Sequence, residues 1–170
     1  FISKFLEDAR SAKAEIMIRP ERIDLALSVS AAVERHQQLA SRKGIRLNGV
    51  CPEGEMPVRA DAVAVGRVLD NLISNALKFS HAESEVWVTA DAEHCEIRVR
   101  DQGPGVSEAD RGDLFKSFCR LSARPTGGES STGLGLSIAM RFIKAMGGEL
   151  KLNSDYRDGA EFVMRLPSIH

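Results

Sequence analysis

The chain has 170 residues, of which 43% are hydrophobic, and this is enough for one compact domain with a sizeable core. Its 23 Lys and Arg residues balance 24 Asp and Glu residues, so the net charge of −1 argues against a general nucleic-acid-binding protein. No apolar run approaches the roughly 20 residues of a membrane helix, and three widely separated cysteines indicate reduced thiols in a cytoplasmic domain rather than a zinc site or a disulfide framework.

The first third of the chain predicts two helical segments followed by strands. Residues 2–16 carry a rough helical stripe and resemble the end of a longer helix. Asp24 is suited to cap a helix that continues to about Ala40 and ends before Gly44. Residues 45–50 alternate as a strand does, and residues 57–60 suggest a second, short strand.

The middle of the chain predicts a long helix, a hairpin and a loop. Asp61 caps the helix, whose apolar residues recur with the helical period as far as about Ser80. Residues 85–90 and 95–100 alternate and are joined by a short polar turn, which predicts a β-hairpin. The stretch from Gly103 to Thr132 is polar and rich in glycine, and a connection of this length is uncommon unless it is functional or disordered.

The last part predicts a third core helix over residues 133–146, stopped by a pair of glycines, and strands near 149–154 and 160–166. We expect the strands to form one mixed sheet of about five strands, covered on one face by three helices. This is a two-layer α/β sandwich of the α+β class, in which the other face of the sheet must be short or partly polar because no helix remains to cover it.

Three polar residues lie on one face of the long helix. Asn71, Asn75 and Lys78 are four and three residues apart among apolar neighbours. An amide oxygen is a suitable hard ligand for Mg²⁺, and a lysine one turn away adds positive charge for phosphate. The alternative, left open by the sequence, is that these residues are the solvated side of the helix.

A second group follows the hairpin. Asp101 offers a carboxylate that can accept a hydrogen bond from an exocyclic amine such as that of adenine. Gly103 and Gly105 permit close approach of the backbone to a ligand. Taken alone, this group is more typical of a simple turn out of the hairpin strand than of a binding site.

Two further groups precede the third helix: one at its start and one in the loop before it. Residues 132–137 (Thr-Gly-Leu-Gly-Leu-Ser) open it with small residues, which favours either anion binding at the helix N-terminus or tight helix packing. Residues 114–120 place two phenylalanines in a polar loop, which indicates a segment that docks on something apolar or a small hydrophobic cluster beneath the loop.

The order of these four groups resembles the catalytic and ATP-binding domain (HATPase_c) of bacterial sensor histidine kinases, within the GHKL superfamily shared with gyrase-type, Hsp90-type and MutL-type ATPases. The groups are similar to the N box (71–79), G1 box (101–105), F box (115–118) and G2 box (133–137) of that family. The resemblance covers the chain from about Asp24 and implies the Bergerat-type ATP-binding fold. One departure is Cys119, where relatives often carry Tyr.

The resemblance implies a role for each matching residue. Asn75 would be the principal Mg²⁺ ligand assisted by Asn71, and Asp101 would select adenine. The residues expected to contact ATP or its phosphates are Asn71, Asn75, Lys78, Phe79, Asp101, Gly103, Gly105, Thr132, Gly133, Leu134 and Gly135. Catalytic roles would fall to Asn71, Lys78 and Arg120, and Lys116 or Arg124 could replace Arg120 at the γ-phosphate.

The resemblance also implies partners and a division of the chain. Residues 1–18 would be the end of the dimerisation helix and its linker, and residues 19–170 the catalytic domain, with an ATP lid at about 106–132. Phosphoryl transfer from Mg-ATP would go to a histidine on a separate dimerisation domain and then to a response regulator, because none of His36, His81, His94 and His170 has the context of a phosphoacceptor. The domain would be cytoplasmic, in a parent protein that could be anchored in the inner membrane.

Two other functions stay open at this point. A nucleotide-responsive module would bind ATP without turnover, and a stand-alone ATPase would hydrolyse it. Related ATPases carry Glu where this chain has Asn71, and an amide cannot act as a general base, so the sequence favours the kinase.

Overall fold

The computed structural model describes residues 17–116 and 135–169, and its main sheet has five strands in the order β2-β4-β5-β7-β6. These strands are β2 (Arg46–Val50), β4 (Glu85–Asp91), β5 (Glu96–Arg100), β6 (Glu149–Leu152) and β7 (Glu161–Arg165). The β2–β4 pair is parallel and the other neighbours are antiparallel, so the sheet is mixed, as the sequence predicted.

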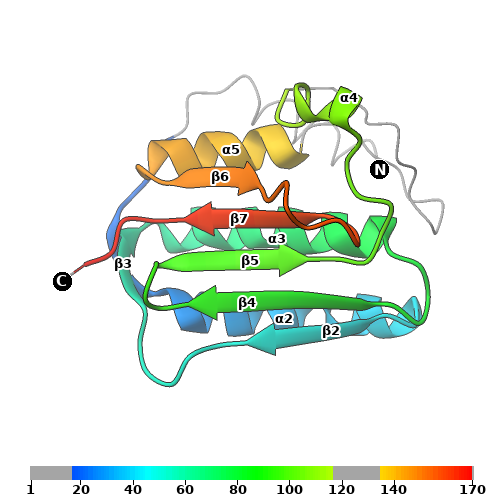
Figure 1. Ribbon diagram of the computed structural model, residues 1–170. Coiled ribbons are helices and arrows are strands. Elements are labelled where there is room, and N and C mark those ends of the chain that lie inside the picture. The colour runs from blue at the N-terminus through cyan, green and yellow to red at the C-terminus, as the bar shows by residue number, and fades with distance from the viewer. Residues whose placement is uncertain (1–16, 117–134, 170) are drawn as a thin grey trace.

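Three helices cover one face of this sheet and leave the other face open (Figure 1). They are α2 (Leu25–Arg42), α3 (Ala62–Phe79) and α5, whose described part is Gly135–Ala145. Val86, Val88 and Ala90 on β4 are buried, whereas the residues between them are partly exposed, which is the alternation expected of a sheet covered on one side. The expected two-layer α+β sandwich is therefore confirmed.

The prediction that all strands join one sheet is wrong. Strand β3 (Pro57–Ala60) pairs instead with β1 (Glu21–Asp24) in a separate two-stranded antiparallel sheet. This small sheet is tied to the start of α2, because the amide of Leu25 donates to the Met56 carbonyl over 2.8 Å. The sequence did not reveal β1, since four residues of largely charged character carry no clear strand pattern.

The ends of the helices agree with the predicted caps. Asp24 accepts a hydrogen bond from the amide of Ala26 at the start of α2. Asp61 accepts from the amides of Val63 and Ala64 at the start of α3. Gly44, just beyond α2, has a φ of 71°, a conformation that glycine adopts without strain. None of the helices in residues 17–116 and 135–169 is long and apolar enough to cross a bilayer.

The open face of the sheet carries ion pairs between arginines and glutamates, which confirms the expectation of a partly polar face. Arg98 and Arg100 on β5 both pair with Glu161 on β7. Arg98 also pairs with Glu96, which in turn pairs with Arg165. This charged layer replaces the helices that cover the opposite face.

Candidate nucleotide site

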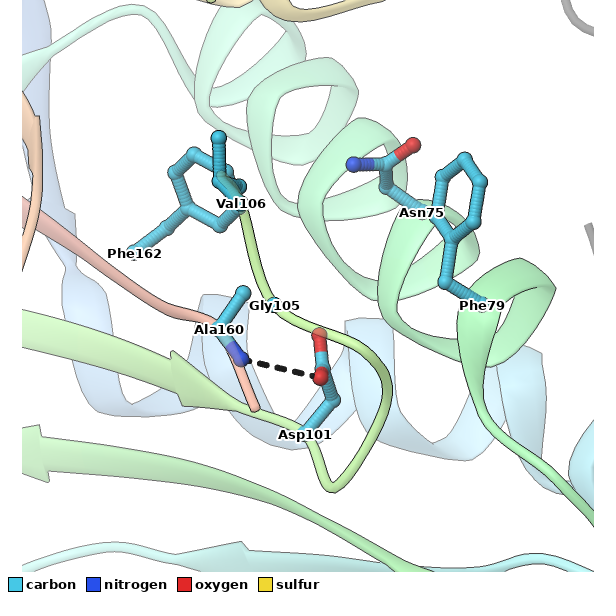
Figure 2. A pocket seen from close by; sticks show the side chains of 7 residues that line it. All are labelled: Asn75, Phe79, Asp101, Gly105, Val106, Ala160 and Phe162. Carbon is cyan, nitrogen blue, oxygen red and sulfur yellow. Dashed lines mark hydrogen bonds between the residues drawn. The ribbon is translucent and has the colours of Figure 1, made fainter. Parts of the chain in front are cut away.

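A pocket lies between α3 and the ends of two central strands, and the space free of atoms there, which includes open solvent, is about 350 Å³. Asn75 and Phe79 extend into it from α3, while Asp101 approaches from the end of β5 on the opposite side (Figure 2). The remaining lining residues are Gly105, Val106, Ala160 and Phe162. The pocket thus brings together residues from the helix and from the hairpin exit that the sequence singled out separately.

Helix α3 places its polar residues at this pocket because of its period. Leu72, Ile73, Ala76 and Leu77 are buried in the core, so the neighbouring positions 71, 75 and 79 face outward along one side. Asn75 lines the pocket, and its half-buried side chain is neither in the core nor simply solvated. Lys78 lies on α3 as predicted but does not line the pocket.

Asp101 is the one carboxylate among the described residues that line the pocket, and it is only 5% exposed. Its Oδ1 accepts hydrogen bonds from the amide of Gly103 over 2.9 Å and from the amide of Ala160 over 3.1 Å. No described residue donates a hydrogen bond to Oδ2. Burial raises the pKa of this carboxyl above its ordinary value, although the two backbone hydrogen bonds oppose the shift.

Two of the predicted glycines are required by close contacts. A Cβ atom at Gly103 would lie 2.6 Å from the carbonyl oxygen of Phe79, at the end of α3. A Cβ atom at Gly105 would lie 2.8 Å from the carbonyl oxygen of Gly159, and Gly105 also has a φ of 73°. Glycine at both positions lets the loop after β5 run between α3 and the turn before β7.

Gly159, in the turn before β7, is a third glycine that close contacts require. A Cβ atom there would lie 2.1 Å from the Asp101 carbonyl oxygen and 2.8 Å from its Oδ1. We expect Gly159→Ala to displace Asp101 and lower the melting temperature by several degrees, since the clash involves backbone that cannot yield easily. Gly112→Ala is the matched control, because nothing lies within 4 Å of the added Cβ. Equal melting temperatures for the two variants would contradict this packing.

Asn71 does not line the pocket but links two helices. Its Nδ2 donates to the carbonyl of Gly135 over 3.2 Å, which ties α3 to the start of the described part of α5. No described residue donates a hydrogen bond to the side-chain oxygen of Asn71. The candidates Arg120, Arg124, Thr132, Gly133 and Leu134 lie outside the described residues.

The aromatic group of the loop begins inside the core. Leu114 is buried, and the ring of Phe115 meets that of Phe162 edge to face at 6.3 Å. Between the pocket and this contact, Glu108–Arg111 forms a short helix, α4. Lys116 forms an ion pair with Asp113 over 2.7 Å.

Several residues of the site escaped the sequence reasoning. Val106, Ala160 and Phe162 line the pocket as ordinary apolar residues, which no motif distinguishes. Tyr156 donates a hydrogen bond from its hydroxyl to the Asp101 carbonyl over 2.7 Å, and its only sequence signal is that it is the sole tyrosine of the chain.

The amide oxygen of Asn75 at the pocket, with that of Asn71 one turn away outside its lining, suits a magnesium ion bound together with a nucleotide. Asn75 supplies an amide oxygen, and the Nδ2 bond of Asn71 leaves its oxygen available on the same helix. Mg²⁺ prefers oxygen ligands and usually binds through few protein groups plus substrate phosphates and water.

Comparison with known proteins agrees with this geometry. The family model described as histidine kinase-, DNA gyrase B-, and HSP90-like ATPase matches residues 60–170, well over half of the chain. The virulence sensor protein BvgS of Bordetella pertussis is 35% identical over 160 residues, which cover 90% of this chain and 13% of BvgS. The histidine protein kinase DivJ of Caulobacter vibrioides is 35% identical over 146 residues, which cover 85% of this chain and 24% of DivJ.

A solved structure with a similar level of sequence identity shares the fold. Full-length ShkA in complex with AMPPNP superposes with a TM-score of 0.80 and 29% sequence identity, covering 98% of this chain and 36% of ShkA. The chain therefore spans about a quarter or less of the two curated relatives and about a third of this structure.

Proposed function

Because the chain belongs to the family of histidine kinase-, DNA gyrase B- and HSP90-like ATPases, we propose that it is the catalytic domain of a two-component sensor histidine kinase. It binds Mg-ATP in the pocket between Asn75 and Asp101 and transfers the γ-phosphoryl group to a histidine on a separate dimerisation domain. The observation that carries the proposal is the buried Asp101 carboxylate, which faces this pocket with one oxygen unused by the described residues.

Adenine recognition rests on that oxygen. The Oδ2 atom of Asp101 accepts a hydrogen bond from the exocyclic amine of adenine, while Oδ1 is held by the amides of Gly103 and Ala160. A guanine base presents a carbonyl oxygen at the same place, which would confront the carboxylate with a second acceptor. Phe79, Val106 and Phe162 supply the apolar walls on which a purine packs.

Phosphate binding would occur toward α5. The N-terminal end of a helix carries a partial positive charge and unpaired backbone amides, both of which attract phosphate oxygens. We assign phosphate binding to Gly133, Leu134 and Gly135, with Thr132 beside them. Lys78 and one of Arg120, Lys116 and Arg124 would add positive charge near the γ-phosphate.

Asn75, assisted by Asn71, would hold the Mg²⁺ ion. The ion neutralises charge on the β- and γ-phosphates when it is bound. The protein residues orient the nucleotide and exclude water from its base, which is the positioning that phosphoryl transfer chiefly requires.

The role of Asn71 favours phosphotransfer over hydrolysis. An amide cannot remove a proton from water, and the Asn71 amide is in addition tied to the Gly135 carbonyl. An imidazole acceptor is itself the nucleophile and needs no such base. The product would then pass its phosphoryl group to a response regulator, and the domain would act in the cytoplasm, where ATP is available.

Incubation of the chain with γ-labelled ATP, Mg²⁺ and a separately prepared dimerisation domain tests the proposal. We expect labelled phosphohistidine, which is stable to base and lost in acid. Release of free phosphate alone would indicate a stand-alone ATPase, and binding without turnover would indicate a regulatory module. Either of these two results would overturn the assignment as a kinase.

A further inference from the structure

Asp101 lies just beyond the end of β5, between the pocket on the helix-covered side of the main sheet and the charged residues on its open face. Strand β5 ends at Arg100, and β7 begins at Glu161 directly opposite it in the antiparallel register. The next residue on each side, Asp101 and Ala160, belongs to the pocket and forms the hydrogen bond drawn in Figure 2. Each residue of the pocket at this point therefore has a chain neighbour in the charged layer of the open face.

Tyr156 contacts both Asp101 at the pocket and Arg100 on the open face of the sheet. Its hydroxyl donates to the backbone carbonyl of Asp101 over 2.7 Å, and this carbonyl belongs to the residue whose side chain enters the pocket. The guanidinium carbon of Arg100 lies 4.4 Å from the centre of the Tyr156 ring, a cation–π contact. The ring is thus clamped on one side by Arg100 and bonded at its tip to Asp101.

Arg100 is itself held firmly. Its Nε donates to Glu161 over 2.5 Å, and Glu161 also accepts from Arg98 and from Asn153, over 3.1 and 2.8 Å. Glu161 is 1% exposed, so these bonds satisfy a carboxylate that burial would otherwise penalise strongly. The layer behind Tyr156 is therefore a hydrogen-bonded network built around a buried carboxylate, in which the arginine side chains stay partly exposed.

We propose that Tyr156, held by Arg100, which Glu161 in turn holds on the open face of the sheet, sets the orientation of Asp101 and thereby the preference of the site for adenine. All three are positioning residues, since none of them lines the pocket. The inference rests on the proposed function, because it takes Asp101 to be the adenine-reading group.

Tyr156 can affect base preference because a hydrogen bond from adenine to Asp101 forms only within a narrow range of distance and angle. Of the polar groups of Asp101, Oδ1 is fixed by two amides, the amide nitrogen by the Ala160 carbonyl and the carbonyl by Tyr156. Without the Tyr156 bond, the peptide group that follows Asp101 can rotate. The carboxylate then samples orientations in which Oδ2 no longer meets the base amine at hydrogen-bonding distance.

The experiment measures binding of ATP and of inosine triphosphate, which has a carbonyl where adenine has its amine, to the whole chain by calorimetry. In Tyr156→Phe the ring and its contact with Arg100 remain and only the hydroxyl is lost. We expect the Kd for ATP to rise about 5- to 10-fold, as loss of a single hydrogen bond predicts. The Kd for inosine triphosphate should change less than 2-fold, so that the ratio of the two affinities falls. Arg100→Lys, which keeps the charge but loses the planar stacking, should lower the ratio in the same direction.

Arg46→Gln is the matched control, since Arg46 pairs with Glu85 on the same open face but at the far edge strand. It should leave both affinities unchanged. An unchanged ATP affinity in Tyr156→Phe, or an equal loss for both nucleotides, would overturn the inference and reduce Tyr156 to a structural role. If the unaltered chain itself showed no preference for ATP, the proposed function of Asp101 would fail instead, so the two failures are distinguishable.

Discussion

Asn75→Ala is expected to abolish magnesium-dependent nucleotide binding while leaving the fold intact. The Asn75 side chain lines the pocket and is not among the buried residues of α3, and alanine is the best helix former, so α3 should be at least as stable as before. With the proposed principal ligand gone, we expect the Kd for Mg-ATP to rise at least about 30-fold, and phosphotransfer to fall by about 100-fold or more. Titration calorimetry, phosphotransfer assays and thermal melting measure the three quantities.

The matched control for this variant is Ser74→Ala. Ser74 is the preceding residue of α3, it is also half-buried, and its hydroxyl bonds to the Asn71 carbonyl within the helix rather than to the pocket. It should retain both affinity and activity. A second control measures ATP with the metal chelated, where the native chain and Asn75→Ala should bind alike. An unchanged Kd for Mg-ATP in Asn75→Ala would show that Asn75 does not hold the metal.

The sequence predicted most of the fold because its elements have strong periods and clear ends. Helix α3 combines an Asp61 cap with eight buried apolar residues, and β4 alternates between buried and partly exposed residues along its whole length. Strand β1 was missed because it is short and charged, and its partner β3 was assigned to the wrong sheet as a result. Long-range pairing of four-residue strands is decided by tertiary contacts, such as that between Leu25 and Met56, which local patterns do not contain.

The site was predictable to the extent that its residues carry unusual chemistry for their positions. Asn75 stood out as an amide in an apolar helix, and Asp101 as a carboxylate between a strand and two glycines. Tyr156 and Gly159 did not stand out, because their roles depend on contact with Asp101 across more than 50 positions of sequence. Only the antiparallel pairing of β5 with β7 brings these segments together.

Asp101→Asn is expected to raise stability and to destroy adenine binding at the same time. The amide keeps an oxygen for the Gly103 and Ala160 amides but turns its NH₂ group into the pocket, where the base amine is also a donor. Two donors then face each other in a buried site, and we expect the Kd for ATP to rise about 100-fold or more. Calorimetry with ATP measures this loss.

The gain in stability follows from the raised pKa of Asp101. Burial is the main cause of the shift, so the folded state disfavours the charged carboxylate that is present at pH 7. Since the folded pKa lies above the unfolded one, the penalty is absent below the ordinary aspartate pKa and grows as the pH rises through the folded value. The asparagine variant avoids this penalty at every pH.

The free energy of unfolding of Asp101→Asn should therefore exceed that of the native chain at pH 7, and the difference should shrink as the pH falls toward the ordinary pKa of aspartate. Urea unfolding of both proteins across this pH range measures the difference. Asp70→Asn is the control, because Asp70 is only partly buried, is paired with Arg35 of α2 and does not line the pocket. A native chain more stable than Asp101→Asn at pH 7 would mean that the backbone hydrogen bonds to the carboxylate outweigh its burial. A stability gain together with lost affinity would show that the buried charge is retained for nucleotide recognition at the expense of the fold.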